Sequence, residues 1–294
     1  MTDGLTVGIL SPGDMGEAVG RVLGQHGVRV IAALEGRSER TRALAAAAGI
    51  EDVGTLVELV RQAGQVLSIL VPGRAEEAAH EIAGAIAETG SGALIVDCNA
   101  VAASTSERAG AAILAAGGRY VDASIIGPPP RRPGVTRFYA SGADAPAFAA
   151  LSEHGLDIRV LDGPIGRASS IKTAYASLTK GLTALGAEMF ISARAHGLLE
   201  PLLEELALSQ PQLLPWLERS LGRMPQKAHR FVGEMEEHGR AFADQGLTPL
   251  MMNGAADLYR FVATTPPGQE SPEDAPERSL DELISALAAA LDQG

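Results

Sequence analysis

A short apolar run that ends in a glycine turn contains the residues best suited to bind a ligand. Leu5 to Leu10 is apolar, Ser11 to Gly16 reads S-P-G-D-M-G, and the next residues have apolar side chains at helical spacing. Strand, turn and helix in this order can bind a pyrophosphate, because N–H groups at the start of the helix attract it and small residues let it approach. An ordinary strand-to-helix turn is the alternative, since Ser11 replaces the first glycine of G-x-G-x-x-G. The residues expected to bind a dinucleotide are Ser11, Pro12, Gly13, Asp14 and Met15.

The residues after the second apolar run indicate which dinucleotide is bound. The segment Leu34-Glu35-Gly36-Arg37-Ser38-Glu39-Arg40 follows that run. Glu35 could bind the ribose 2′-hydroxyl of NAD, whereas Arg37, Ser38 and Arg40 suit the 2′-phosphate of NADP. Two arginines and a serine outweigh one glutamate, so NADP is the expected cofactor and NAD the alternative. Ser38 could equally cap a helix beside either cofactor.

Two later apolar runs also end in residues that could contact a ligand. One ends at Pro72, and the other ends in the polar residues that follow Val96. Ligands collect at the carboxyl ends of parallel strands. We therefore expect cofactor contacts at these ends and, at the second, contacts to the nicotinamide ribose or the substrate. The expected contact residues are Leu70, Val71 and Pro72 for the cofactor and Asn99 for the cofactor or substrate.

A second glycine-rich turn, Gly163 to Gly166, precedes a long helical pattern that contains Lys172. Small side chains surround this lysine in the pattern, namely those of Ala168, Ser169, Thr173 and Ala176. Such a surface can pack closely against a cofactor or substrate. Exposed lysines usually have no specific role, so spacing alone does not assign one here.

Alternating apolar runs and helical patterns fill about the first 160 residues. This alternation predicts strand–helix–strand units and a parallel sheet covered by helices on both faces, which is an α/β, Rossmann-type doubly wound fold. The expected strands are Leu5–Leu10, Val28–Leu34, Val66–Val71, Ala93–Asp97, Tyr120–Ala123, Arg137–Ser141 and Ile158–Leu161.

The pattern changes after Gly166 to one without strands. Helices are expected from Ser169 to Ala263, with pauses at Gly197 and Pro201 and breaks near four further prolines, Pro211, Pro215, Pro225 and Pro249. A proline-rich loop over 264–276 and a final amphipathic helix over 281–291 follow. We therefore expect an NAD(P)-binding Rossmann domain at 1–165 and an all-helical substrate and dimerisation domain at 166–294.

Composition narrows the class of protein. A chain of 294 residues with 46% hydrophobic residues suits two domains, and a formal net charge of −12 argues against a nucleic-acid partner. The single cysteine, Cys98, excludes a disulfide framework, and the six histidines lack paired ligand spacing, so no metal is expected. Neither a leader segment nor a membrane-spanning run is found, so a cytoplasmic protein without a membrane partner is expected.

Three segments in order resemble motifs of the β-hydroxyacid dehydrogenase family, which includes 3-hydroxyisobutyrate, tartronate semialdehyde and 6-phosphogluconate dehydrogenases. Gly8–Gly16 resembles the motif G-x-I-G-L-G-x-M-G, Asp122–Gly127 resembles D-A-P-V-S-G, and Gly163–Lys172 resembles G-x-x-G-x-G-x-x-x-K, with Ala168 at its third glycine. The resemblance covers roughly residues 5–195. It implies a nicotinamide cofactor and a small substrate that carries a carboxylate.

Within this resemblance, Lys172 is the acid/base that exchanges a proton with the substrate while a hydride moves to or from the nicotinamide. Ser124 and Gly127 would hold the substrate carboxylate. The chain has Ala176 where the family has asparagine, and Tyr175 could supply a hydroxyl instead. We therefore expect a substrate other than the best-known small acids of the family.

Two other departures would change how the substrate is held. Ile126 stands where the family has serine, which makes the pocket more apolar. The stiff segment Pro128–Arg132 adds two arginines, which are expected either to lie in solvent or to bind an anionic substrate. Family members also place a basic residue from a later helix near the site, so His229 and Arg230 are candidates for substrate binding.

The resemblance and the residues together predict an NADP-dependent oxidoreductase that interconverts a small β-hydroxy acid and its oxo acid or semialdehyde. The alternatives are an imine reductase-like enzyme and a non-catalytic nucleotide-binding protein with the same fold. Apolar residues at helical spacing on the long helix, Leu178, Leu182, Leu185, Met189 and Phe190, favour a homodimer. Burial of this stripe within its own domain is the alternative.

Overall fold

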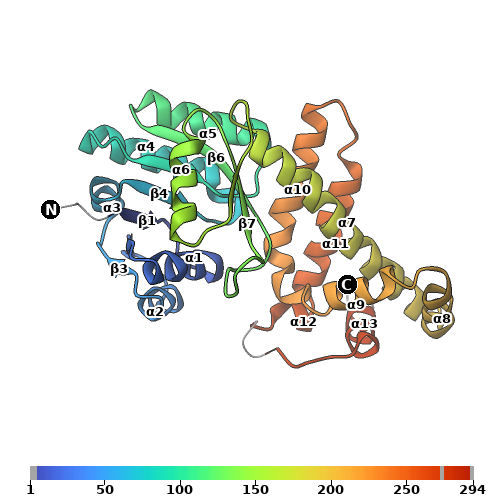
Figure 1. Ribbon diagram of the computed structural model, residues 1–294. Coiled ribbons are helices and arrows are strands. Elements are labelled where there is room, and N and C mark those ends of the chain that lie inside the picture. Colours follow the sequence, from blue (N-terminus) through green and yellow to red (C-terminus); the bar gives the residue numbers. More distant parts are fainter. Residues whose placement is uncertain (1–4, 272–274, 292–294) are drawn as a thin grey trace. The chain divides into compact units, whose positions relative to one another are not determined.

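Eight strands form one sheet in the N-terminal part of the chain (Figure 1). In the computed structural model, residues 5–271 and 275–291 are described, and the chain divides into two compact units, Met1–Thr173 and Ala174–Gly294. The sheet has the order β3-β2-β1-β4-β5-β6-β7-β8, whose first six strands follow the order of a Rossmann fold. The strands are β1 Thr6–Ile9, β2 Arg29–Ala32, β3 Glu51–Asp52, β4 Gln65–Ser68, β5 Leu94–Asp97, β6 Arg119–Ile126, β7 Arg137–Ser141 and β8 Ile158–Val160.

Helices cover both faces of this sheet, as the doubly wound pattern predicts. One core contains Val19 of α1 and Phe148 of α6 against the strands, and the other contains Leu59 of α3 and Ile82 of α4. The α/β fold class is therefore confirmed. The helices of this unit are α1 Asp14–Gln25, α2 Glu39–Ala47, α3 Leu56–Gln62, α4 Ala75–Thr89, α5 Ala103–Ala115 and α6 Ala145–Ala149, with short 3-10 turns at Pro72–Arg74 and Ala150–His154.

Each of the seven expected runs coincides with an observed strand, but there are three differences. β4 ends at Ser68, three residues before the expected end at Val71. β3 was not expected, because its two residues are polar and exposed and form a strand only through pairing with β2. β6 continues three residues beyond Ala123 because it pairs with β7, from which only a ten-residue loop separates it. No crossover helix lies in that loop, so β7 runs antiparallel to β6, and the expectation of an entirely parallel sheet is wrong at this strand.

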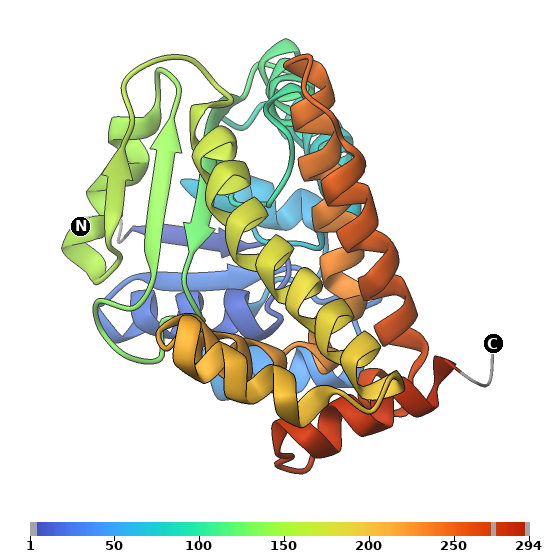
Figure 2. The same ribbon diagram turned by 90° about the vertical axis from the view of Figure 1, so that its right-hand side faces the viewer.

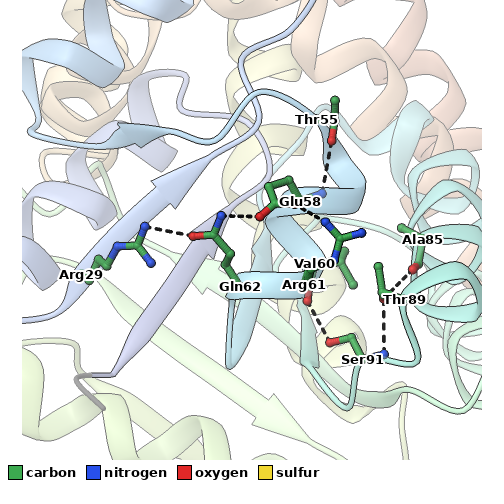
Figure 3. Close-up of polar contacts among 9 residues, drawn as sticks. All are labelled: Arg29, Thr55, Glu58, Val60, Arg61, Gln62, Ala85, Thr89 and Ser91. Carbon is green, nitrogen blue, oxygen red and sulfur yellow. Dashed lines mark hydrogen bonds and ion pairs between the residues drawn. The ribbon is translucent and has the colours of Figure 1, made fainter. Parts of the chain in front are cut away.

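Polar contacts at the amino end of β2 connect several elements there (Figure 3). Arg29 donates two hydrogen bonds to Glu51 at 2.9 and 2.7 Å and one to Gln62 of α3 at 3.0 Å. Thr55 accepts a hydrogen bond from the Glu58 N–H and caps α3, and Ser91 donates to the Val60 carbonyl at 2.8 Å. These structural contacts join β2, β3, α3 and the segment before β5.

Helices make up the described residues of the second unit, apart from the turns and loops between them, which confirms an all-helical C-terminal part. Pro225 and Pro249 precede helices as expected, but Pro215 lies in the first turn of α9 and does not break it, because a first-turn N–H needs no helical acceptor. Ser279 and Glu282 form a capping box at the last helix. The helices are α8 Leu199–Ser209, α9 Leu213–Leu221, α10 Ala228–Asp244, α11 Leu250–Thr264, α12 Pro266–Gln269 and α13 Leu280–Ala289, with a 3-10 turn at Pro225–Lys227.

The helix α7, Arg167–Ala195, is a single unbroken helix that begins in the first unit and continues into the second (Figure 2). Its apolar stripe is not uniform. Phe190 is fully buried in the core of its own unit, whereas Leu178 and Leu185 are 62% and 60% exposed.

In the described part of the chain, no helix is long and apolar enough to span a bilayer.

Candidate active site

The turn after β1 has the geometry of a dinucleotide-binding turn despite its serine. The Gly13 N–H donates to the Ser11 carbonyl at 2.9 Å. Among the described residues only glycines have positive φ, so Ser11 has an ordinary backbone conformation and no glycine is required there. A Cβ on Gly16 would lie 2.3 Å from the Ser11 carbonyl oxygen, so that position does require glycine. Serine is therefore tolerated at the first position of the fingerprint, while the third must be glycine.

The start of α1 provides room and hydrogen-bond donors for a pyrophosphate. Gly13 is the N-cap residue, and no side chain caps this helix. A Cβ built on Gly13 meets no protein atom within 4 Å, so space lies above the first N–H groups. These two observations fit the phosphates of a dinucleotide, which bind to uncapped helix N–H groups where small residues permit close approach.

Arg37 and Arg40 lie beside this turn. Arg37 donates to the Leu10 carbonyl at 3.3 Å, and Arg40 forms an ion pair with Asp14 at 2.8 Å. Ser38 accepts a hydrogen bond from the Thr41 N–H at 3.3 Å and so caps α2, which is the structural role that the sequence left open for it. Two guanidinium groups are therefore held next to the first turn of α1, where the ribose end of a cofactor would lie.

The expected contact residues after β4 and β5 differ in exposure. Val71 is 47% exposed, at the carboxyl end of the sheet, with Leu70 and Pro72 partly exposed on either side. Asn99 is only 2% exposed. Its side chain accepts from the Leu70 N–H at 2.5 Å and donates to Ser68 at 3.0 Å and to Asp97 at 2.5 Å. The amide of Asn99 thus holds the loop after β4 in place, and its polar atoms face protein groups rather than a ligand.

The substrate motif of the resemblance lies on β6, and its serine is internal. Ser124 is fully buried and donates to the Ala168 carbonyl of α7 at 2.7 Å. Gly127 follows the strand with φ of 124°, and a Cβ there would lie 2.1 Å from the Val135 carbonyl oxygen. Gly127 is exposed at the carboxyl edge, whereas the Ser124 hydroxyl holds α7 against the sheet.

Lys172 lies in the second turn of α7, and its amino group reaches the same edge of the sheet. Its Nζ donates to the Ile125 carbonyl at 2.8 Å, and the side chain is partly buried. Ile125 is the penultimate residue of β6, whose carboxyl end faces the same way as those of β1, β4 and β5. The structure thus brings the lysine to the edge that carries the Ser11–Gly16 turn.

A buried carboxylate that was not predicted as a site residue connects α1 with the proline-rich segment after β6. Glu17 of α1 is 1% exposed and forms ion pairs with Arg131 at 2.5 Å and with Arg21 at 3.1 Å. Arg131 belongs to the proline-rich segment after Gly127. This segment is therefore attached to the first turns of the helix that follows the glycine turn. The only signal in the sequence was the position of Glu17 directly after the fingerprint.

The remaining candidates lie on α7 and α10. Tyr175 follows Lys172 by one helical turn and is 48% exposed, and Ala176 is buried. His229 and Arg230 lie exposed in the first turn of α10. Partial burial and the charge of Arg230 lower the pKa of His229 from its ordinary value. Among the described residues, no group of three His, Cys, Asp or Glu side chains is arranged to hold a metal ion.

Known proteins resemble this chain over most of its length. Residues 6–153 match the NAD binding domain of 6-phosphogluconate dehydrogenase, and residues 193–262 match a domain of unknown function, DUF1932. A solved protein of unknown function, described as structurally similar to 3-hydroxyacid dehydrogenases, is 29% identical with a TM-score of 0.66, and the match covers 88% of this chain and 97% of that one.

Two enzymes share the fold at lower identity. Mycobacterium tuberculosis 3-hydroxyisobutyrate dehydrogenase is 18% identical with a TM-score of 0.68, and Streptomyces aurantiacus imine reductase is 18% identical with a TM-score of 0.53. Both matches cover 97% of this chain and 99% of the other. The family match covers half of the chain and includes the glycine turn and the first seven strands. The chain therefore belongs to the oxidoreductase family defined by the NAD-binding domain of 6-phosphogluconate dehydrogenase.

Proposed function

We propose that this protein is an NADP-dependent oxidoreductase that interconverts a small β-hydroxy acid and its oxo acid or semialdehyde, with Lys172 as the acid/base. The hydrogen bond between Lys172 Nζ and the Ile125 carbonyl carries this proposal. It holds an ionisable group at the carboxyl ends of the strands, where doubly wound folds bind their ligands. The similarity of the fold to 3-hydroxyisobutyrate dehydrogenase supports the same class of reaction.

The residues have distinct roles in this proposal. The backbone N–H groups after Gly13 bind the pyrophosphate, and the nicotinamide, when bound, accepts or supplies the hydride. Lys172 Nζ donates a proton to the substrate carbonyl oxygen in reduction and takes one from the hydroxyl in oxidation. An ammonium group has three N–H bonds, so one can remain on Ile125 while another reaches the substrate. Gly127, Tyr175, His229 and Arg230 are the residues proposed to contact the substrate, with Asn99 and Ser124 supporting them from behind.

Two observations favour NADP over NAD. Arg37 and Arg40 are both held beside the glycine turn, and each offers a guanidinium group that can bind a phosphate through two hydrogen bonds. Replacement of both by alanine should raise the Kd of NADPH roughly 10- to 100-fold, the loss expected for hydrogen bonds to a charged group. The Kd of NADH should change little. Arg29→Ala, at the amino end of β2, is the matched control, and an equal loss for both cofactors would contradict the preference.

The catalytic proposal is tested by a screen that follows the absorbance of the reduced nicotinamide with hydroxy acids, semialdehydes and imines. Lys172→Ala should lower kcat roughly 10²- to 10⁴-fold, the usual contribution of a general acid or base. The Kd of NADPH should stay the same. Lys227→Ala, at an exposed position, should have no effect on kcat. Unchanged turnover in Lys172→Ala would overturn the acid/base role.

The two alternative functions give different results in the same screen. Turnover of cyclic imines in preference to carbonyl compounds would favour an imine reductase, whose fold this chain shares. Tight NADPH binding without turnover of any compound would favour a nucleotide-binding protein. Lys172 supports the carbonyl reaction, because a carbonyl oxygen must gain a proton on reduction, whereas an imine that is already protonated as an iminium ion needs no further proton donor.

We also propose that the protein acts as a homodimer in the cytoplasm. Leu178 and Leu185 lie seven residues apart on α7, on one side of the helix, and both are more than half exposed. A second copy of α7 could cover these side chains. The cytoplasm is proposed because the single cysteine is buried and no disulfide can form within the chain.

A further inference from the structure

Asp122 lies at the centre of a buried hydrogen-bond cluster at the start of α7. Its side chain is fully buried. The Oδ2 atom accepts hydrogen bonds from the backbone N–H groups of Gly166, Ala168 and Ser169 at 2.9, 2.9 and 3.1 Å. These are the N–H groups that a helix leaves without partners in its first turn. A carboxylate on strand β6 therefore caps a helix that begins 45 residues later in the chain.

Three hydroxyl groups complete the surroundings of Asp122. Ser141 of β7 donates to Oδ2 at 2.8 Å, while Ser106 of α5 and Ser169 of α7 donate to Oδ1 at 3.0 and 2.6 Å. The carboxylate thus accepts six hydrogen bonds from three segments of the first unit. The positive end of the α7 dipole adds to the attraction. These contacts explain how this carboxyl group can be buried here, since both of its oxygen atoms accept hydrogen bonds.

The same strand holds the lysine. Ile125 is three residues after Asp122 on β6, and its carbonyl accepts the hydrogen bond from Lys172 Nζ at 2.8 Å. Lys172 is only three residues after Ser169, whose N–H and hydroxyl both bind Asp122. The first turns of α7 are therefore attached to β6 through Ser169 and through the lysine side chain itself.

We propose that Asp122 is a positioning residue for Lys172: its carboxylate fixes the first turn of α7 on the sheet and so sets where the lysine amino group lies. This inference rests on the proposed function of Lys172 and adds the group that places it. Asp122 does not touch the substrate or the cofactor, because it is fully enclosed by protein atoms.

The cluster also extends toward the predicted cofactor loop. Ser106 lies 3.0 Å from the hydroxyl of Tyr120, which donates to Asp97 at 3.1 Å. Asp97 in turn accepts from Asn99, which holds the Leu70 N–H. One continuous set of buried hydrogen bonds therefore joins the loop after β4 to the start of α7. A change at Asp122 is accordingly expected to affect the lysine first and the cofactor loop only weakly.

The lysines of this chain permit a direct test that needs no substrate. The sequence contains three, Lys172, Lys180 and Lys227, so protein labelled with [ε-¹³C]lysine gives three side-chain signals. Asp122→Asn keeps the shape of the side chain but removes its charge and one acceptor. We expect the Lys172 signal to shift and its titration midpoint to change by half a pH unit or more. The Lys227 signal should stay as in the wild type.

A matched control and an activity measurement complete the test. Ser279→Ala removes the cap of α13 and should leave the Lys172 signal unchanged. On the best compound from the screen, Asp122→Asn should lower kcat at least tenfold with the Kd of NADPH within twofold of the wild type. A folded D122N variant with the wild-type Lys172 signal and titration would overturn the proposal.

A second variant covers the case in which D122N does not fold. Ser169→Ala removes only the hydroxyl contact at 2.6 Å and retains the other five hydrogen bonds. It should move the Lys172 signal in the same direction by a smaller amount, and an unmoved signal would overturn the proposal. Failure of the proposed function can be distinguished from failure of this inference. If the wild type turns over no compound, the Lys172 signal can still be compared between the wild type and either variant.

Discussion

Asp97 and Asp122 are both buried, and hydrogen bonds through Tyr120 and Ser106 connect the two carboxyl groups. Asp97, Tyr120, Ser106 and Asp122 form three successive links at 3.1, 3.0 and 3.0 Å. The two hydroxyl groups supply two protons, so the third link needs a proton on a carboxyl group. Burial, together with the charge of Asp122, raises the pKa of Asp97 to about 6. Below about pH 6 a proton on Asp97 therefore supplies this third link and Tyr120 donates to Ser106, whereas above that pH Tyr120 donates to Asp97.

This assignment predicts a pH-dependent stability. Because the pKa of Asp97 is higher in the folded than in the unfolded chain, the group stabilises the fold below about pH 4 and loses that contribution as the pH rises through about 6. Asp97→Asn imitates the protonated form and has no proton to lose. Between pH 4 and 7 the wild type should therefore lose roughly 2 kcal/mol of unfolding free energy relative to the variant.

Urea denaturation of both proteins at several pH values measures this difference. Asp162→Asn, at an exposed position of the same unit, serves as the control and should follow the wild type at every pH. A difference between wild type and Asp97→Asn that stays constant with pH would show that Asp97 is ionised in the folded protein throughout.

The site residues differ in how far their roles could be predicted from the sequence. Gly13 is recognisable because its role depends on local spacing, a glycine directly before a helix, whereas Lys172 is recognisable because its segment resembles a family motif. The hydroxyl of Ser124 and the amide of Asn99 face inward, toward Ala168 and Leu70, which are 44 and 29 residues away. Such partners are brought together only by the sheet, so their direction could not be predicted.

The two glycines of the first turn, Gly13 and Gly16, have different structural roles. Gly16 permits the close approach of α1 to the end of β1, since a Cβ there would lie 2.3 Å from the Ser11 carbonyl oxygen. Gly13 has no protein atom within 4 Å of its Cβ position. The fingerprint therefore combines a glycine required for packing with a glycine that leaves space for a ligand.

Alanine at each position should separate these roles. Gly16→Ala should destabilise the protein by roughly 1–3 kcal/mol, the cost of overpacking a close contact. Gly13→Ala should leave the melting temperature nearly unchanged but raise the Kd of NADPH at least tenfold, because the new methyl group occupies the space proposed for the pyrophosphate. Thermal unfolding and fluorescence titration with NADPH measure both quantities. A Gly13→Ala variant with unaltered NADPH affinity would argue that the phosphates bind elsewhere.

At the scale of elements, helices and strands with strong local patterns were predictable and context-dependent ones were not. The run Arg137–Ser141 was predicted with its observed bounds as β7. Its antiparallel direction depends on the ten-residue loop before it, which the alternation of strands and helices did not reveal. The two-residue strand β3 exists only by pairing with Ile31 and Ala32 of β2, so no local signal could predict it.

The whole molecule contains more exposed apolar surface on α7 than its own unit covers. Leu178 and Leu185 are exposed, while Phe190 and Ala187 on the same helix are buried. Replacement of both leucines by aspartate should convert the proposed dimer to a monomer, because two charges on an interface core oppose its burial. Light scattering after size-exclusion chromatography measures the mass in solution.

The control for this prediction is Leu208→Asp, at an 81% exposed position on α8, which should leave the mass unchanged. A wild-type protein of about 30 kDa in solution at micromolar concentration would contradict the dimer, since the chain itself has a mass of 30.4 kDa.

The sequence by itself determined the class of fold and the position of the glycine turn, because both depend on the order and spacing of neighbouring residues, and its resemblance to a known family singled out Lys172 as the proposed acid/base. Tertiary structure alone decided that Asp122 caps α7, that Asn99 and Ser124 face inward, and that Glu17 holds Arg131. These contacts join residues between 29 and 114 positions apart. Their energies depend on burial and distance, which exist only once the sheet has formed.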